Sequence, residues 1–182
     1  MTSILITGGT GTFGSSAARS LLDRKSVEKI IIFSRDEQKQ DEMRHRFDGE
    51  DRLRFFVGDV RDADRLRMAL QGVEIVLHAA AMKIVPACEY DPIEAVKTNV
   101  QGSQNVISTA IRCGVSQVIA LSTDKAVSPA NLYGSTKLCM EKVLIEGNLR
   151  GETRFSCSRY GNVVDARGEV LDLFKEQLRI GA

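Results

Sequence analysis

Short apolar runs alternate with longer amphipathic segments along most of the chain. The runs at 4–7, 29–33, 53–57, 75–78, 117–121 and 154–160 have the length of strands and are rich in aliphatic or aromatic residues. The segments between them predict helices at about 12–24, 36–47, 62–70 and 92–113, with a further helix around Tyr133. Because strand and helix alternate, the pattern predicts a parallel, doubly wound α/β sheet with right-handed crossovers.

Glycines at a three-residue spacing connect the first strand to the first helix. Gly8, Gly11 and Gly14 permit a tight turn, close backbone approach to a pyrophosphate and close packing of the helix on the strand. The amides at the start of that helix then face the anion. This pattern indicates a Rossmann-type nucleotide site, with a purely structural turn as the alternative. The loop residues expected to bind the cofactor are Gly8, Thr10, Gly11, Thr12, Phe13 and Gly14.

The end of the second strand indicates which nicotinamide cofactor is bound. Ser34 and Arg35 stand where an enzyme that selects NAD usually has an acidic residue for the ribose hydroxyls. A hydroxyl and a guanidinium suit a 2′-phosphate, so the sequence favours NADP. The alternative is that Arg35 is a solvated surface residue and Asp36 binds the ribose.

Further candidate cofactor residues follow the third and fourth strands. Asp59, followed by Val60, could accept from the adenine amino group or cap the next helix. Small side chains after His78 either let the cofactor pass close to the backbone or serve packing; they are Ala79, Ala80 and Ala81. Asn99 lies inside a predicted helix, where its amide indicates a hydrogen-bonding task near the active site.

Tyr133 and Lys137 are four residues apart and therefore share a helix face. A nearby ammonium favours the ionised phenol, which takes a proton from an alcohol while a nicotinamide takes the hydride. Asp124 and Lys125 come just upstream, at the end of a predicted strand. They add two proton carriers that a simple alcohol oxidation does not need.

Composition narrows the function classes. The 182 residues suit one domain, 1–182, and a formal charge of +1 gives no broad electrostatic footprint for nucleic acid. No apolar run approaches the length of a membrane span and no signal peptide is recognisable, so we expect a cytoplasmic protein. The four cysteines have no C-x-x-C spacing and no neighbouring histidine cluster, so no metal site is predicted.

Several motifs together resemble the extended short-chain dehydrogenases/reductases. The stretches that carry the resemblance are I-T-G-G-T-G-T-F-G at 6–14, A-A-A-M-K-I-V-P at 79–86, K-T-N-V at 97–100, S-T-D-K-A-V-S-P-A-N-L-Y-G-S-T-K at 122–137 and R-Y-G-N-V-V at 159–164. Within that superfamily the chain resembles the nucleotide-sugar 4,6-dehydratases of bacterial polysaccharide biosynthesis. The match is best with the soluble, inverting UDP-N-acetylglucosamine 4,6-dehydratases (5-epimerising).

The resemblance implies roles for individual residues. Tyr133 and Lys137 would form the hydride-transfer dyad, Thr123 would hold the sugar O4, and Asp124 with Lys125 would carry the elimination. Lys125 is favoured as the C5 base and Asp124 as the C6 acid. The residues expected at the UDP-sugar are Lys83, Tyr160 and Asn162, although Ile84 replaces a histidine that sometimes follows Lys83 in the family.

The resemblance also implies a larger protein. The relatives continue into a smaller C-terminal portion that closes over the UDP-sugar, and that portion is apparently missing after Ala182. An amphipathic helix at 168–178 is expected to precede it. At full length a homo-oligomer is expected. Two other functions stay open: a nucleotide-sugar 4-epimerase, which has no need of Asp124 and Lys125, and a non-catalytic NADP-binding module.

Overall fold

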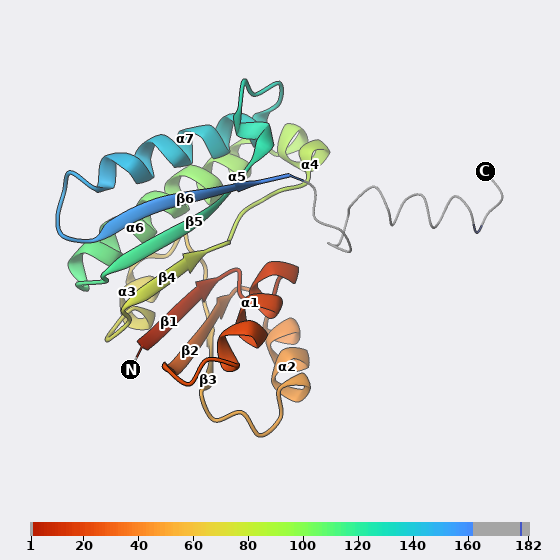
Figure 1. Cartoon of the computed structure of the whole chain (residues 1–182). Coiled ribbons are helices and arrows are strands. Elements are labelled where there is room, and N and C mark those ends of the chain that lie inside the picture. The colour runs from red at the N-terminus through yellow and green to blue at the C-terminus, as the bar shows by residue number, and fades with distance from the viewer. Residues whose placement is uncertain (1, 162–178, 180–182) are drawn as a thin grey trace.

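Six parallel strands form one sheet in the spatial order β3-β2-β1-β4-β5-β6 (Figure 1). The computed structural model describes residues 2–161 and 179. The strands are β1 (Thr2–Thr7), β2 (Val27–Ser34), β3 (Leu53–Val57), β4 (Ile75–His78), β5 (Gln117–Thr123) and β6 (Arg154–Tyr160). The sheet therefore confirms the predicted doubly wound α/β fold of Rossmann type.

Helices connect each strand to the next. The α-helices are α1 (Thr12–Leu22), α2 (Glu37–Arg46), α3 (Ala63–Ala69), α4 (Val85–Tyr90), α5 (Pro92–Val96), α6 (Gly102–Arg112) and α7 (Leu132–Gly147). A π-helical turn, Lys97–Gln101, joins α5 to α6, and a 3₁₀ turn, Asp124–Ala126, follows β5. None of the helices in the described part of the chain is long and apolar enough to span a bilayer.

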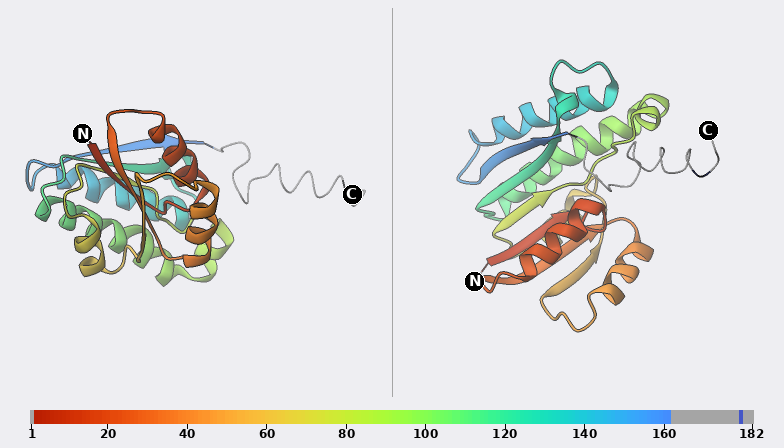
Figure 2. Two further views of the ribbon diagram at one scale, coloured as in Figure 1. Left: turned by 90° about the horizontal axis from the view of Figure 1, so that it is seen from below. Right: turned by 45° about the vertical axis from the view of Figure 1, so that its right-hand side comes forward.

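The central strands are buried on both faces, which explains their nearly continuous apolar runs. On one face, Ile30 and Ile32 of β2 belong to a core that includes Ala18 of α1 and Met43 of α2. On the other face, neighbouring β2 residues join a larger core with α3, α6 and α7, formed by Ile31, Phe33, Leu66, Val106, Ile107, Met140 and Leu144. Figure 2 shows the helices on the two sides of the twisted sheet.

The strand order changes direction between β1 and β4. From β1 the chain proceeds outward to β2 and β3, and it then returns to β4 on the other side of β1. The connections therefore diverge at this point, where open α/β sheets bind their ligands. All candidate residues at strand ends lie along this edge of the sheet because the strands are parallel (Figure 1).

The structure corrects two of the helix predictions. The predicted single helix at 92–113 contains the π-helical turn Lys97–Gln101, which residue periodicity does not reveal. The short helix α4 was not predicted, because its six residues include Pro86 at the first turn and offer too little periodicity. The predicted helix at 168–178 lies outside the described residues.

Candidate active site

The glycine loop forms a cradle in which side chains would collide with backbone. Gly8 has a φ of +65°, and a Cβ there would lie 2.9 Å from the amide nitrogen of Ala80. A Cβ on Gly14 would lie 2.5 Å from Gly9 Cα. Gly11 is the N-cap of α1, and no side chain caps the first amides of that helix. The loop therefore combines close access with free amide donors, which suits a pyrophosphate.

Thr7 connects this loop to the end of β4. Its Oγ1 accepts hydrogen bonds from the amides of Ala79 and Ala80, at 3.1 and 3.2 Å. Its hydroxyl proton therefore points to Nδ1 of the buried His78, 2.7 Å away. Burial lowers the pKa of His78 to about 3, so this imidazole is neutral. The predicted alanine segment is thus fixed against the glycine loop.

Ser34 and Arg35, at the end of β2, differ in their exposure to solvent. Ser34 is buried, and Gln40 of α2 donates a hydrogen bond of 3.0 Å to its hydroxyl. The Arg35 side chain is 57% exposed and lies 3.6 Å from Asp59. Of the two predicted phosphate ligands, Arg35 is therefore accessible, whereas the Ser34 hydroxyl already has a partner inside the protein.

The structure favours neither of two alternative roles for acidic residues: Asp36 as the ribose ligand, and Asp59 as the cap of the next helix. Asp36 accepts a hydrogen bond from the Lys39 amide and caps α2, so its carboxylate serves its own helix. The cap of α3 is Asp62, not Asp59. Partial burial alone would raise the pKa of Asp59, but hydrogen bonds from Arg61 and the charge of Arg35 lower it. Asp59 is therefore an ionised carboxylate at the expected adenine position, followed by the buried Val60.

The residues predicted to form the hydride-transfer dyad, Tyr133 and Lys137, lie on the first turns of α7, beside the end of β5. Burial raises the pKa of Tyr133, while a side-chain hydrogen bond with Thr123 acts in the opposite direction. Lys137 is 5% exposed and donates a 2.5 Å hydrogen bond to the carbonyl oxygen of Leu121. Burial lowers its pKa to about 8. The negative charges of Tyr160, Cys88 and Asp124 raise the pKa of Tyr133 in the same direction as burial, so the expected lowering of its pKa by Lys137 is not found.

Asp124 and Lys125 occupy the 3₁₀ turn that directly follows β5. The Asp124 carboxylate accepts hydrogen bonds from Thr123 Oγ1 at 2.9 Å and from the Lys125 amide at 2.8 Å. Lys125 Nζ lies 3.3 Å from the same oxygen. The Thr123 hydroxyl, and then Lys125, lower the pKa of Asp124, which is 57% exposed. Asp124 is therefore a solvated, ionised carboxylate.

Asn99 is buried in the π-helical turn, and both the oxygen and the nitrogen of its side-chain amide form hydrogen bonds. It accepts from the Met82 amide at 2.8 Å and donates to the Met82 carbonyl at 2.9 Å. It also donates to Thr136 Oγ1 at 3.0 Å, one turn beyond Tyr133 on α7. Asn99 therefore holds the segment after β4 against α7 and has the hydrogen-bonding task that was predicted for its amide.

Two of the predicted sugar-binding residues, Lys83 and Tyr160, lie at the same edge. Lys83 is exposed between β4 and α4, and Tyr160 is 42% exposed at the end of β6. A negative charge on Tyr160 raises the pKa of Tyr133. Asn162 lies outside the described residues.

Comparisons with known proteins place this site in a family. The model of a family described as polysaccharide biosynthesis protein matches residues 4–182. The chain belongs to this family. The resemblance to extended short-chain dehydrogenases/reductases, inferred from the motifs, is thereby confirmed.

Named relatives include both a dehydratase and an epimerase. The chain is 52% identical over 182 residues to a UDP-N-acetylglucosamine 4,6-dehydratase (inverting) from Campylobacter jejuni, covering 98% of this chain and 54% of the relative. It is 46% identical over 184 residues to a UDP-glucose 4-epimerase from Rickettsia prowazekii, with the same two coverages. The chain thus spans about half the length of these relatives.

Solved structures agree with the fold. Pen from Bacillus thuringiensis has a TM-score of 0.95 at 40% identity, over 98% of this chain and 56% of that chain. A dTDP-glucose 4,6-dehydratase from Streptomyces venezuelae, solved with NAD bound, has a TM-score of 0.83 at 26% identity, over 99% of this chain and 63% of that chain. The core of this polysaccharide biosynthesis family member is therefore that of a Rossmann-type reductase.

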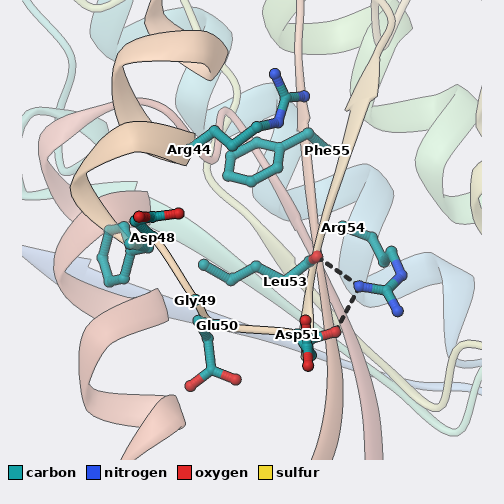
Figure 3. A pocket seen from close by; sticks show the side chains of 9 residues that line it. Arg44, Asp48, Gly49, Glu50, Asp51, Leu53, Arg54 and Phe55 are labelled. Atoms are coloured by element: carbon teal, nitrogen blue, oxygen red, sulfur yellow. Dashed lines mark hydrogen bonds between the residues drawn. The ribbon is translucent and has the colours of Figure 1, made fainter.

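A small pocket of about 210 Å³ lies elsewhere, near the amino end of β3 (Figure 3). Arg44 covers the ring of Phe55 at its side, with 4.9 Å from the guanidinium carbon to the ring centroid. Arg54 donates to the carbonyl oxygens of Asp51 and Leu53. This pocket is at the opposite end of the strands from the glycine loop, so it does not belong to the candidate active site.

Sequence reasoning missed several residues that shape the site in this family member. Thr7 links β1 to the end of β4, and Thr136 links α7 to Asn99. Gln40 donates a hydrogen bond to the Ser34 hydroxyl. Glu141 lies buried beside the end of β6. A polar residue at the end of a buried strand was the available signal for Thr7. Glu141 gave none, because a glutamate in a helix usually faces solvent.

Proposed function

We propose that this chain is the cofactor-binding and catalytic part, over 1–182, of an NADP-dependent nucleotide-sugar 4,6-dehydratase. The substrate proposed is UDP-N-acetylglucosamine, with inversion at C5, in bacterial polysaccharide or nonulosonic acid biosynthesis. The observation that carries the proposal is the Asp124–Lys125 turn, because it adds an acid–base pair directly to a Thr123–Tyr133–Lys137 hydride-transfer site. The inverting C. jejuni relative supports the same reaction.

The chain's own groups suit the first step. When bound, the nicotinamide accepts hydride from C4 of the sugar and returns it to C6. We assign Thr123 to hold the O4 hydroxyl, and Tyr133 to take the O4 proton after the phenol has lost its own proton to solvent. We propose that the Lys137 ammonium, buried one turn away, would hold the cofactor ribose. The glycine loop offers the phosphate-binding amides.

The elimination needs a base at C5 and an acid at C6. We assign Lys125 as the base and Asp124 as the acid. The two groups are an ammonium and a carboxylate 3.3 Å apart. Desolvation beneath a bound sugar disfavours such an ion pair, and transfer of one proton from Lys125 to Asp124 gives a neutral amine and a carboxylic acid. Those are the forms that remove the C5 proton and protonate the leaving C6 hydroxyl.

A 4-epimerase is the second candidate, favoured by the 46% identity to the Rickettsia relative. Replacing Asp124 with Asn separates the two reactions. In a dehydratase, Asp124→Asn removes the C6 acid and lowers formation of the 4-keto-6-deoxy product by about 10²- to 10³-fold. In an epimerase, C4 epimerisation continues at close to its original rate. Products are followed by mass and NMR, with Asp64→Asn on the exposed surface of α3 as the control.

NADP is the cofactor we propose because Arg35 is free to turn toward a 2′-phosphate. Asp59 is held more closely by Arg61, at 2.7 Å, than by Arg35 at 3.6 Å, so it stays neutralised when Arg35 moves. We expect Arg35→Ala to weaken NADP⁺ binding about 10- to 100-fold and NAD⁺ binding less than about threefold. Calorimetric titration of both cofactors tests this, with Arg24→Ala as control. Equal losses for both cofactors would contradict the assignment.

The remaining parts of the proposal concern the whole protein. We propose a cytoplasmic enzyme that acts on a UDP-sugar and works as a homo-oligomer. Exposed apolar side chains on the short helices α4 and α5 are compatible with contacts to further protein, notably Tyr90 and Ile93 at 86% and 65% exposure.

A further inference from the structure

Glu141 is a buried carboxylate on the catalytic helix, one turn beyond Lys137. It is 4% exposed. Arg159, at the end of β6, donates to both of its oxygens, from Nε at 2.8 Å and from Nη2 at 2.6 Å. Ser122 of β5 also donates to Glu141 Oε1. Glu141 thus joins α7 to two strands at the edge where the candidate site lies.

These contacts alone do not require a buried charge. Burying a carboxylate is costly, and an ion pair of this kind is often no more stabilising than an apolar pair of the same shape. Arg159 is itself half exposed, so a pairing closer to the surface would join the same elements. A second buried charge nearby indicates an electrostatic role for the Glu141 carboxylate.

That second charge is Lys137. Its Nζ donates to a backbone carbonyl, which stabilises an ammonium less than a carboxylate does. Lys137 and Glu141 are four residues apart on α7, so their side chains share one face of the helix, and they bind the adjacent β5 residues Leu121 and Ser122. Burial lowers the pKa of Lys137, whereas the negative charges of an ionised Cys157 and of Glu141 act in the opposite direction. The charge of Glu141 therefore acts on Lys137 across space.

The other titratable groups near Lys137 carry no negative charge at neutral pH. His78 of β4 is neutral, since its pKa is lowered to about 3. Cys157 of β6 is a thiol, because burial raises its pKa to about 11. Arg159 is a cation that donates to both carboxylate oxygens of Glu141. In the described part of the site, Glu141 is thus the anion that faces Lys137, and Arg159 is the cation paired with that anion.

We infer that Glu141 is a positioning residue that keeps Lys137 an ammonium, and that Arg159 both anchors Glu141 to the end of β6 and moderates its charge. The inference rests on the proposed function, since it assigns the hydride-transfer lysine its counter-charge. It makes the protonation of Lys137 depend on β6, the strand that ends next to Tyr160 and Gly161. A displacement of Arg159 would change the charge balance at the lysine.

Two substitutions predict effects of opposite sign. Glu141→Gln keeps the shape and hydrogen-bonding capacity but leaves Lys137 facing the Arg159 cation, so we expect the pKa of Lys137 to fall from about 8 by about 1. Arg159→Met leaves the carboxylate unopposed, so the pKa of Lys137 rises. The measurement is NMR of ¹³Cε-labelled lysine as a function of pH, with Lys137→Met to assign the signal. Exposed Lys142→Met, also on α7, is the control.

Opposite shifts in the two variants support the inference. Shifts of the same sign, or none in either folded variant, would show that Glu141 serves packing only and would overturn it. If Glu141→Gln does not fold, the upward shift in Arg159→Met decides alone. The NMR signal does not depend on turnover. Failure to dehydrate a UDP-sugar with both shifts present would therefore contradict the proposed function and leave the charge pairing in place.

Discussion

Replacing Tyr133 with Phe is expected to lower turnover about 10³-fold while leaving NADP⁺ affinity within about threefold of the original value. In the proposed reaction, Tyr133 accepts the proton of the C4 hydroxyl after its phenol has lost its own proton to solvent, and a positioned acid–base group contributes about 10²- to 10⁴-fold. Phenylalanine retains the ring, so the half-buried position at the start of α7 stays filled. The loss is measured as the initial rate of product formation at saturating UDP-sugar.

Tyr90→Phe provides the matched control for that loss. Tyr90 is 86% exposed at the end of α4, and its hydroxyl has no part in the proposed chemistry. We expect its turnover to equal that of the unmodified protein. A Tyr133→Phe variant that retains more than about a tenth of the original rate would show that another group takes the C4 proton.

Replacing Gly134 with Ala is expected to abolish activity by displacing the catalytic helix. Gly134 is the residue after Tyr133, and a Cβ there would overlap the carbonyl oxygen of Lys125 and lie 3.0 Å from Pro129 Cβ. Backbone cannot yield as a flexible side chain does, so α7 must move away from the Asp124–Lys125 turn. We expect the free energy of unfolding to fall by about 3 kcal/mol and turnover to fall more than about 10²-fold.

Gly147→Ala is the matched substitution in the same helix. A Cβ at Gly147 would meet side-chain atoms of Ile107 and Phe155 at 3.0 to 3.1 Å, and these can adjust. Thermal unfolding and turnover of this variant should remain close to those of the unmodified protein. If Gly134→Ala behaves like Gly147→Ala, the close packing of α7 on the catalytic turn is not what positions the site.

Local patterns were sufficient to predict the sheet and the glycine loop. The run Ile30–Ile31–Ile32 packs into cores on both faces, so its composition alone identifies a central strand. Gly8 and Gly14 were placed correctly because only glycine tolerates the backbone approach found there. These features depend on neighbours in the sequence, which is why a single chain reveals them.

Contacts between distant segments were not predictable. Gln40 and Ser34 lie six residues apart, but their hydrogen bond depends on how α2 returns to β2. Glu141 and Arg159 meet only because β6 pairs with β5 beneath α7. The ionisation of Tyr133 and Asp124 also depends on burial and hydrogen bonds, so spacing alone gave the wrong direction for Tyr133.

The most direct test of the account is to incubate the protein, with any C-terminal continuation it has in its natural context, with NADP⁺ and UDP-N-acetylglucosamine. Mass spectrometry and NMR of the sugar give the outcome. The account predicts loss of one water, a ketone at C4 and a methyl group at C6, with inverted C5. A product of unchanged mass that is epimeric at C4 would contradict the dehydratase assignment.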